Sequence, residues 1–510
     1  MSKEYLIGID LGTTLAKCVI YDSAGAVLAE AQEAMRIRYP RSGEAEQDAE
    51  DFYTASCALI RQCLQAGRID PARVAALGID SQMGGIMSVD RRFRPVTYYD
   101  TPLDSRCAAE NVEMHERFGK RILALNGSLS TYGPKILYWK KRDAWKEIAR
   151  FLQPSAFVAG RLAGHGSDQA YMDRTFLCFS GLADLQAGRW SEELCGAMGV
   201  DQGKLPRVVD STDIVGEVSA QGAADTGLAR GTPIAAGCGD QSAGFVGAGI
   251  LREGQMVDVS GTACVLGASV ADYRCDERHG TLACMKAAIG GGYQLISVVL
   301  GGRTHNWFIE QFCAPEAGAV PAGFGSVYEY LDSLAAKVPA GSDGLVSINY
   351  LQGRFFPPDP TVRGLFVGHT WAHTRMHFYR AILESIAYDH YLTREIVREL
   401  LPGLELGAVT AIGSGAASEL WMQIKADVLQ SPYQSLQRSD LSTLGSALIG
   451  GYAVGLFKDV DTITERFARP SRTVRPRTGA DRPYLRNIQV YRELFERLAP
   501  IYHRLAGGDS

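Results

Sequence analysis

Two short segments rich in glycine, serine and threonine hold the residues whose types and spacing best suit chemistry. Near the N-terminus, an apolar run ends in Asp10 and is followed by a Gly-Thr-Thr turn. Roughly 250 residues later, the sequence Asp-Val-Ser-Gly-Thr at 258–262 again places an acidic residue before small and hydroxylated ones. Backbone N–H groups and hydroxyls in such a turn can bind phosphate oxygens, and a carboxylate can hold a divalent cation. The repetition predicts two related lobes that bind one nucleotide from both sides.

The residues of the first turn have distinct expected roles. Asp10 would hold Mg²⁺ through water, while Gly12, Thr13 and Thr14 would donate hydrogen bonds to the phosphates. Lys17 would add a positive charge near the same oxygens. Taken alone, this turn is equally typical of an ordinary β-hairpin.

The second turn decides between these interpretations. Gly261 and Thr262 match the first turn in type and position, which favours phosphate binding at both. The sequence has no GxxxxGK[S/T] segment, so a Walker-type ATPase is excluded.

A third acidic residue stands where a predicted strand meets a predicted helix. Asp240 and Gln241 follow the apolar run 232–236 and open a segment of small residues. A carboxylate at such a junction is well placed to accept a proton from a substrate hydroxyl, as phosphoryl transfer requires. Aspartate is also favoured at this position as a simple helix N-cap, and the residue alone does not separate the two roles.

Alternating and continuous apolar runs predict the elements that must position these residues. In the first half we expect an antiparallel meander, a helix and a parallel strand, at 5–10, 16–21, 27–31, 49–65 and 74–79. The second half repeats the order with strands at 254–259, 264–269, 293–299 and 408–412. We further expect helices at 375–400, at 484–505 and, as a buried helix, within 444–457. This is a mixed α/β pattern in two halves.

Length and composition limit the number of domains and the classes of partner. A chain of 510 residues exceeds the size at which single cores stop growing, so two domains are expected, 1–250 and 251–510, divided at a glycine-rich loop. A formal net charge of −5 gives no reason to expect nucleic acid or an anionic membrane as partner.

The N-terminus does not resemble a signal peptide, and the eleven cysteines are scattered without a CxxC pair. Reduced thiols and a cytoplasmic location are therefore expected. The oligomeric state is left open, a homodimer included.

In this order and spacing, the three segments resemble those of carbohydrate kinases of the FGGY family, within the sugar kinase–actin–Hsp70 superfamily. The chain is most similar to xylulokinases. Further matching segments are 43–48, 78–83, 189–194, 363–368, 413–418, 426–429 and 444–447.

The resemblance implies an ATP-dependent sugar kinase with two ribonuclease-H-like lobes and the active site in the cleft between them. Asp240 matches the family's catalytic base. The two turns match its phosphate loops, with ATP and Mg²⁺ as cofactors. The adenosine contact falls on a glycine-rich turn formed by Gly413, Gly415 and Ala416. Glycine has no Cβ, which lets backbone approach a flat base closely.

The sugar pocket departs from the xylulokinase pattern. Where xylulokinases have Gln-Met-His-Gly, this chain has Gln82, Met83 and then two glycines, Gly84 first. The family's Asp-x-Arg pair aligns with Asp104 and Arg106, and Gln241 completes the expected sugar-binding set. Loss of a hydrogen-bonding imidazole should change substrate preference. A pentulose such as xylulose is the leading acceptor, with other ketoses and polyols as alternatives.

Two further readings compete. A sugar- or nucleotide-binding regulator without catalysis would explain the altered pocket, and an actin-like ATPase would explain the two turns alone. Separately, His369, His373 and His377 are spaced to share a helix face, but no acidic or cysteine partner stands nearby, so a metal site is not expected.

Overall fold

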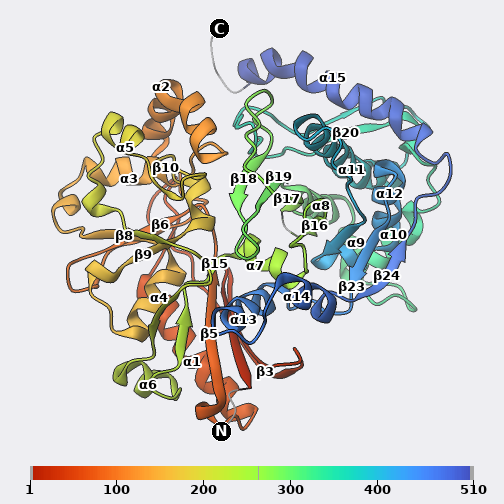
Figure 1. Cartoon of the computed structure of the whole chain (residues 1–510). Helices are drawn as coiled ribbons and strands as arrows, with labels where there is room; N and C mark the ends of the chain where they lie inside the picture. Colours follow the sequence, from red (N-terminus) through yellow and green to blue (C-terminus); the bar gives the residue numbers. More distant parts are fainter. Residues whose placement is uncertain (1–3, 262, 506–510) are drawn as a thin grey trace.

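The computed structural model describes residues 4–261 and 263–505, and its elements form two lobes that stand side by side (Figure 1). The first lobe is built on a seven-stranded sheet with the order β13-β14-β5-β1-β2-β3, and β15 pairs with β5. These strands are β1 (Tyr5–Leu11), β2 (Leu15–Asp22), β3 (Val27–Ala34), β5 (Val74–Ser81), β13 (Ile214–Glu217), β14 (Pro233–Ala235) and β15 (Cys238–Gly239). β1, β2 and β3 pair antiparallel and β5 joins β1 in parallel, so the predicted meander and its parallel addition are confirmed.

Alternation along β1 buries both faces of this sheet. Ile7 and Ile9 pack with Phe52 of α1 (Ala49–Ala66), together with α4 (Pro154–Ala163) and α6 (Ala220–Thr226). Leu6 points to the opposite face and packs with Leu444 of α13 (Leu441–Ala453). A Cβ on Gly8 would lie 1.8 Å from the Thr443 carbonyl oxygen, so α13 can approach the sheet only because this position is glycine.

A smaller region covers the upper part of the first lobe in Figure 1. Its four-stranded sheet has the order β4-β7-β6-β8. The strands are β4 (Glu46–Gln47), β6 (Ile86–Val89), β7 (Pro95–Asp100) and β8 (Arg150–Leu152). The accompanying helices are α2 (Ala108–Asn126), α3 (Gly133–Lys140) and α5 (Glu192–Met198). Two short pairs complete the lobe, β9 (Tyr171–Asp173) with β12 (Arg207–Val209) and β10 (Ala183–Asp184) with β11 (Arg189–Trp190).

The second lobe repeats the plan of the first. Its seven-stranded sheet has the order β18-β19-β17-β16-β22-β23-β24. The strands are β16 (Met256–Ser260), β17 (Cys264–Val270), β18 (Ala283–Lys286), β19 (Tyr293–Val299), β22 (Val409–Ile412), β23 (Tyr433–Leu436) and β24 (Pro470–Val474). β16 pairs antiparallel with β17 and parallel with β22, as β1 does with β2 and β5. The expected two-lobed α/β fold is confirmed.

The helices of the second lobe surround this sheet. They are α8 (Gly301–Phe312), α9 (Ala314–Gly318), α10 (Val327–Ala335), α11 (Arg375–Leu400), α12 (Glu419–Leu429) and α15 (Arg482–Leu505), whereas α14 (Val460–Phe467) packs with α13 and the first sheet. A short pair, β20 (Val346–Ile348) and β21 (Leu365–Val367), lies beside α11. The C-terminal helix was predicted from 484 and packs on α11 and β20, as expected.

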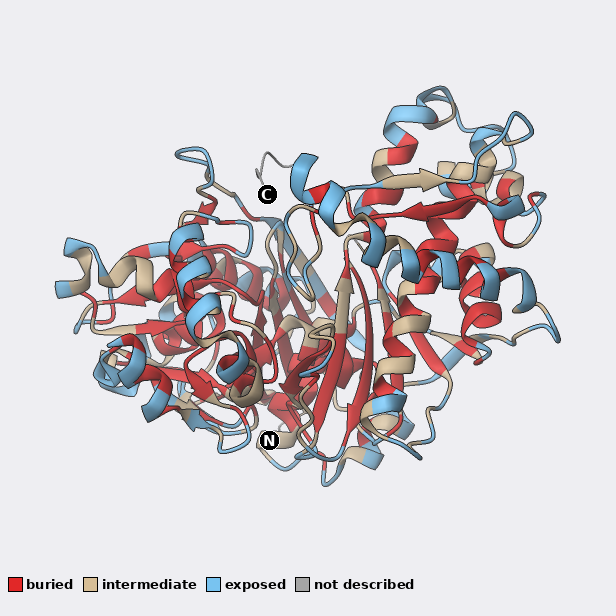
Figure 2. Cartoon of the chain, turned by 90° about the horizontal axis from the view of Figure 1, so that it is seen from above, coloured by how far each residue is buried: buried red, intermediate tan, exposed pale blue. Residues whose placement is uncertain are grey.

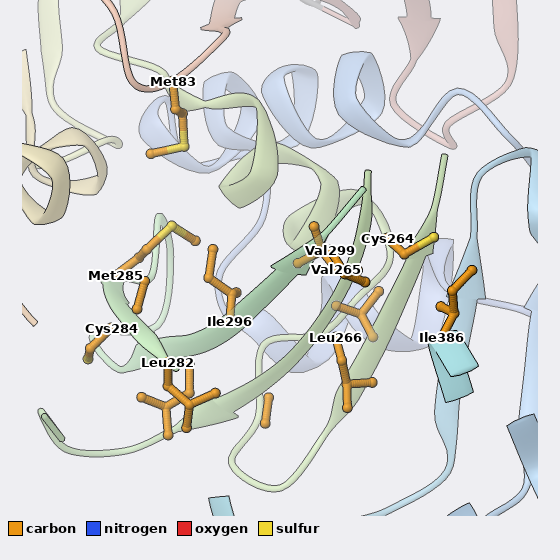
Figure 3. Close-up of a cluster of buried hydrophobic side chains, with 14 of the residues drawn as sticks. Met83, Cys264, Val265, Leu266, Leu282, Cys284, Met285, Ile296, Val299 and Ile386 are labelled. Atoms are coloured by element: carbon orange, nitrogen blue, oxygen red, sulfur yellow. The ribbon is translucent and has the colours of Figure 1, made fainter. Parts of the chain in front are cut away.

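The largest apolar cluster joins the two lobes. Figure 3 shows part of it, where Leu266 of β17 and Ile296 of β19 lie among other apolar side chains and Met83 enters from the first lobe. The central strands of the two large sheets are buried and the edge strands β3 and β24 are largely exposed, while the helices around the sheets show exposed outer faces (Figure 2). Because α13 returns from the second half of the sequence to the first sheet, the division at 250/251 stays a prediction. Among the described residues, no helix is long and apolar enough to cross a membrane.

Candidate active site

Three carboxylates meet at the ends of neighbouring strands in the first lobe. In the register of β1 and β5, Asp10 stands opposite Asp80. β15 then pairs Cys238 with Asp80, and Asp240 follows as the first residue of α7 (Asp240–Gly247). Paired strands lie about 4.8 Å apart, so this register brings Asp10, Asp80 and Asp240 to one edge of the sheet.

Their surroundings disfavour the charged forms. Burial, followed by the charge of Asp10, raises the pKa of Asp240 to about 7. Burial also raises the pKa of Asp80, and the charges of Asp10 and Asp240 add to it, although the Ser446 hydroxyl donates a 2.5 Å hydrogen bond to Asp80. Burial raises the pKa of Asp10 as well, against the effects of Asp80 and Lys17. The raised pKa values mean that nearby positive charges do not offset the burial and mutual repulsion of these three carboxylates.

Sequence reasoning assigned no role to Asp80, although the segment 78–83 was among the family matches. The carboxyl is fully buried, and its Oδ1 has no hydrogen-bond partner within the described part of the chain. The available signal was its position at the end of a continuous apolar run, in the strand expected to join β1.

The first turn is tied to the predicted sugar-binding residues by side-chain amides. Thr13 Oγ1 donates to Gln82 Oε1 at 2.8 Å, and Gln82 Nε2 donates to Gln47 Oε1 at 2.7 Å. Gln47 Nε2 in turn donates to the Thr13 carbonyl at 2.9 Å. Gln47, from the matching segment 43–48, is a second residue that the sequence did not single out. Thr14 and Lys17 remain exposed.

A cavity of about 480 Å³ opens beside this turn. Asp10 and Lys17 line it, together with Glu30 of β3 and residues 440–443 at the start of α13. Gly12 closes the hairpin through its N–H, which donates to the Leu15 carbonyl at 3.1 Å. Asp10 and Lys17, on the strands that flank the turn, therefore face this cavity, whereas Gly12, Thr13 and Thr14 are not among the residues that line it.

Asp104 and Arg106, the other predicted sugar residues, bind each other. Arg106 Nε donates to Asp104 Oδ2 at 2.8 Å, and the Ala45 N–H donates to the same oxygen at 2.7 Å. The Arg106 guanidinium also contacts Glu46 at 2.8 Å. Both side chains are nearly buried, so this pair fixes the position of the segment between β7 and α2.

The two glycines after Met83 differ in the space around them. A Cβ on Gly84 would contact nothing closer than 3.4 Å, whereas a Cβ on Gly85 would overlap the Tyr99 ring at 2.3 Å. Lys135 Nζ holds the backbone here by donating to the Gly84 carbonyl at 3.2 Å. At the position where xylulokinases carry histidine there is therefore space, but Gly84 has a φ of +86°, a backbone conformation that a residue with a side chain rarely adopts.

Met83 and Gln241 lie close to Asp240. A Cβ on Gly239 would lie 2.4 Å from the Met83 sulfur, so Met83 packs directly against the residue before Asp240. The Gln241 N–H donates to Asp240 Oδ1 at 2.7 Å. Gln241 Oε1 has no partner among the described residues.

The second turn rests on a buried ion pair. Lys425 Nζ lies 2.7 Å from Asp258 Oδ2 and donates to Ser260 Oγ at 2.6 Å. Burial opposes ionisation of Asp258, but Lys425 and the nearby His390 outweigh it and lower its pKa. Gly261 follows directly, and Thr262 lies outside the described residues. Asp258, the acidic residue of the second segment, is thus paired with Lys425 rather than left free for a cation, and no local pattern indicated this partner.

The glycine-rich turn lies against the second turn. A Cβ on Gly415 would lie 2.6 Å from both the Ser260 Cβ and the Trp421 ring. Ser260, Gly261 and Gly415 line a cavity of about 990 Å³ in the second lobe. Gly413 and Ala416 support the turn from outside this lining, and the Ala416 carbonyl accepts a 3.3 Å hydrogen bond from Arg472.

The expected helix face of three histidines is not formed, because α11 begins only at Arg375. His373 lies before it and pairs with Thr370, while His377 contacts Thr374 and Asp343.

Comparisons with known proteins identify the family of this chain. The model of the N-terminal domain of the FGGY family of carbohydrate kinases matches residues 5–247, and that of the C-terminal domain matches residues 257–454. The chain belongs to the FGGY family of carbohydrate kinases.

Individual relatives cover nearly all of the chain. The xylulose kinase of Bacillus subtilis strain 168 is 27% identical over 506 residues, covering 98% of this chain and 97% of its own. The glycerol kinase of Bordetella pertussis is 28% identical over 537 residues, covering both chains completely. Among solved structures, xylulose kinase from Rhodospirillum rubrum superposes with a TM-score of 0.87 at 26% identity, covering 98% of this chain and 100% of that one.

Proposed function

We propose that this carbohydrate kinase transfers the γ-phosphoryl group of ATP to a hydroxyl of a pentulose such as xylulose, with Asp240 as the base. The observation that carries the proposal is the position of Asp240, half-buried at the meeting of β5, β15 and α7 with a pKa of about 7. A carboxyl with this pKa is partly ionised at neutral pH and strong enough to accept the hydroxyl proton as the bond to phosphorus forms.

The nucleotide would span the two lobes. Its adenosine would occupy the 990 Å³ cavity beside Gly415, supported by Gly413 and Ala416. Its phosphates would extend towards the turns, whose proposed donors are Gly12, Thr13, Thr14, Lys17, Gly261 and Thr262. Donors fixed in two opposed turns stabilise charge on the transferring group without reorganising during the reaction.

Mg²⁺ fits the carboxylate edge. Magnesium prefers oxygen ligands and usually binds through one or two carboxylates, water and substrate phosphates rather than a complete protein cage. Asp10 faces the cavity, and Asp80, whose Oδ1 has no hydrogen-bond partner among the described residues, stands beside Asp10 on the neighbouring strand. Among the described residues, no three His, Cys, Asp or Glu side chains form a group that could hold a metal by themselves. Asp10 would hold the ion, which when bound neutralises phosphate charge.

The sugar would lie between Asp240 and the end of β5. Its contacts would come from Gln82, Met83, Gly84 and Gln241. The side-chain oxygen Oε1 of Gln241, which has no partner among the described residues, can accept a hydrogen bond from a sugar hydroxyl. Asp104 and Arg106, already bonded to each other, would fix the wall of the pocket. Closure of the lobes around the substrates would exclude water as a competing acceptor.

A second acceptor class has its own support. The glycerol kinase relative matches over the whole chain at 28% identity, and a gluconokinase of Bacillus subtilis strain 168 is 25% identical. The space at Gly84 also separates this pocket from one that carries histidine. Another ketose or a polyol is therefore the alternative acceptor.

The test is ADP release from Mg·ATP across a panel of D- and L-ketopentoses, ketohexoses, pentitols, tetritols, gluconate and glycerol. The proposal expects a pentulose, xylulose first, to give the highest kcat/KM. A polyol or gluconate well above every pentulose would overturn the pentulose assignment but keep the kinase. Equal ADP release with and without each acceptor would overturn the proposed transfer itself.

A further inference from the structure

A buried ion pair lies next to the second turn. Asp258 and Lys425 are 0% and 2% exposed, and Lys425 Nζ lies 2.7 Å from Asp258 Oδ2. A buried ion pair often adds no stability over apolar residues of similar volume, because taking two charges out of water costs as much as their attraction returns. The groups that this pair contacts therefore say more about its role than the attraction between its members.

The pair reaches the turn through the hydroxyl of Ser260. Lys425 Nζ donates to Ser260 Oγ at 2.6 Å, and Ser260 Oγ donates to Asp258 Oδ1 at 2.8 Å. Together with the ion pair, these two hydrogen bonds form a closed ring of three contacts. The ring joins α12, which carries Lys425, to the last residue of β16.

Ser260 is the residue at which the strand ends and the turn begins. The pairing of β16 with β17 stops where Ser260 stands opposite Cys264. Gly261 comes next, and its N–H donates to the Ala263 carbonyl at 3.0 Å. Ser260 and Gly261 both line the 990 Å³ cavity. Because hydrogen bonds to Oγ restrain the backbone of Ser260, they also restrain the direction in which the chain enters the turn.

Lys425 also contacts an aromatic ring of the cavity wall. Its Nζ lies 3.9 Å from the centroid of the Trp421 ring, one helical turn earlier on α12. A cation over the face of a tryptophan ring is attracted to the π electrons of that ring. Trp421 lines the cavity, whereas Lys425 is not among the residues that line it. One ammonium group therefore holds two parts of the wall from behind.

The acidic residues of the two related segments have opposite surroundings. Asp10 faces the first-lobe cavity, and burial raises its pKa. Burial would also raise the pKa of Asp258, but Lys425, followed by His390, lowers it below its usual range. Asp10 is therefore left for a cation from outside the chain, whereas Asp258 already has one within it. This difference indicates that Asp258 serves to hold Lys425 in place.

We propose that Lys425 is a positioning residue for phosphoryl transfer: with Asp258 it holds the Ser260 hydroxyl and keeps the second turn directed at the phosphate chain of the nucleotide. The inference rests on the proposed function, because it takes the second turn as a donor to the phosphates. It predicts that loss of the ring of contacts weakens phosphate-bearing ligands and spares adenosine.

The first test separates the turn from the ion pair. Ser260→Ala removes the hydroxyl that joins them and leaves Asp258 and Lys425 paired. Equilibrium dissociation constants are measured for adenosine and for Mg·ATP, and kcat is measured for acceptor-dependent ADP release, all well below the unfolding midpoint. Ser385→Ala is the matched control, because Ser385 is a buried serine of the same lobe whose hydroxyl donates to the Ile382 carbonyl of its own helix.

A second variant removes the pair without leaving a charge unpaired. Asp258→Ser combined with Lys425→Met, the pair-free variant, is compared with the same protein after Ser260→Ala is added. The comparison uses the ratio of the dissociation constants of ATP and adenosine, so that any general change in the cavity wall cancels. If Lys425 acts through Ser260, the added substitution should leave this ratio unchanged.

The proposal expects Ser260→Ala to weaken ATP binding about tenfold, equivalent to about 1.4 kcal/mol, while adenosine binds as in wild type. kcat should fall at least as much, because aligned donors stabilise the transferring group most strongly in the transition state. The pair-free variant should show the same rise in the ratio. Ser385→Ala should match wild type throughout.

Several results would overturn the inference and leave the kinase proposal standing. One is an equal loss of ATP and adenosine binding in Ser260→Ala, or no loss of either. Another is a wild-type ratio in the pair-free variant, which decides the matter even if Ser260→Ala does not fold. A further rise when Ser260→Ala is added would show that Lys425 does not act through Ser260. If the wild type binds neither adenosine nor ATP, the proposed function fails as well.

Discussion

The hydroxyl of Thr13 donates a 2.8 Å hydrogen bond to the side-chain oxygen of Gln82. Thr13 belongs to the proposed phosphate turn, while Gln82 lies at the end of β5 beside the proposed sugar position. One contact therefore links the proposed phosphate and sugar positions within the first lobe.

This link predicts that Thr13→Val and Gln82→Met have non-additive effects on kcat/KM for the sugar. A neutral hydrogen bond contributes about 0.5–1.5 kcal/mol, so a coupling of that size is expected in the double-mutant cycle. Thr14→Val with Gln82→Met is the matched cycle, because Thr14 is exposed. Equal coupling in both cycles would show that the Thr13–Gln82 contact has no specific role.

The buried pair of Asp258 and Lys425 predicts an asymmetric stability series. Lys425→Met leaves Asp258 buried and unpaired, which should cost about 3–5 kcal/mol of stability. Asp258→Ser combined with Lys425→Met should recover most of this loss. Urea unfolding midpoints provide the measurement.

The exposed Arg121–Glu193 pair supplies the control, since Arg121→Met should shift the midpoint little. A double variant as unstable as Lys425→Met would mean that packing, rather than the unpaired charge, determines the loss.

The raised pKa of Asp80 should make the free energy of unfolding depend on pH. Its folded-state pKa is raised, so its contribution to stability is fully present below the unfolded pKa of about 3.9 and declines as pH rises towards the folded pKa. Asp80→Asn removes this decline. The gain in stability over wild type should grow between pH 4 and 7, by up to about 1.4 kcal/mol per pH unit.

Thermal unfolding from pH 4 to 8 measures the effect. Exposed Asp168→Asn should give a difference that stays flat across the range. A gain for Asp80→Asn that shrinks as pH rises would contradict the assigned direction.

Ionisation of Asp240 should set the acidic side of the pH profile of kcat/KM. The base must be ionised to accept a proton, and its pKa is about 7. kcat/KM for the sugar should therefore fall about tenfold per pH unit below pH 7. If activity instead falls near pH 4, where an unperturbed carboxyl titrates, either Asp240 is not the base or its pKa is not raised.

Local patterns were sufficient to predict much of the framework. The run that ends at Asp10 gave β1, and α11 occupies the predicted 375–400, because a long amphipathic pattern specifies its own element. The junction that carries Asp240 was also found, since an apolar strand and a small-residue helix surround it.

The missing parts depend on pairings between distant segments. Asp80 joins the carboxylate edge only through the register of β5 with β1 and β15. Likewise, Asp258 of β16 and Lys425 of α12 meet only once the second lobe has folded, and neither residue's surroundings in the sequence indicate the other. Side-chain contacts of this kind follow from tertiary packing and not from periodicity.

The central claim is that Asp240 is the base for phosphoryl transfer to a sugar. The most direct measurement compares wild type, Asp240→Asn and the control Asp168→Asn in two assays, acceptor-dependent ADP release and equilibrium ATP binding. The account predicts that Asp240→Asn loses at least a hundredfold in acceptor-dependent turnover, within the usual contribution of general base catalysis, while ATP binding stays close to wild type. Turnover of Asp240→Asn at more than a few per cent of wild type, with ATP still bound, would contradict it.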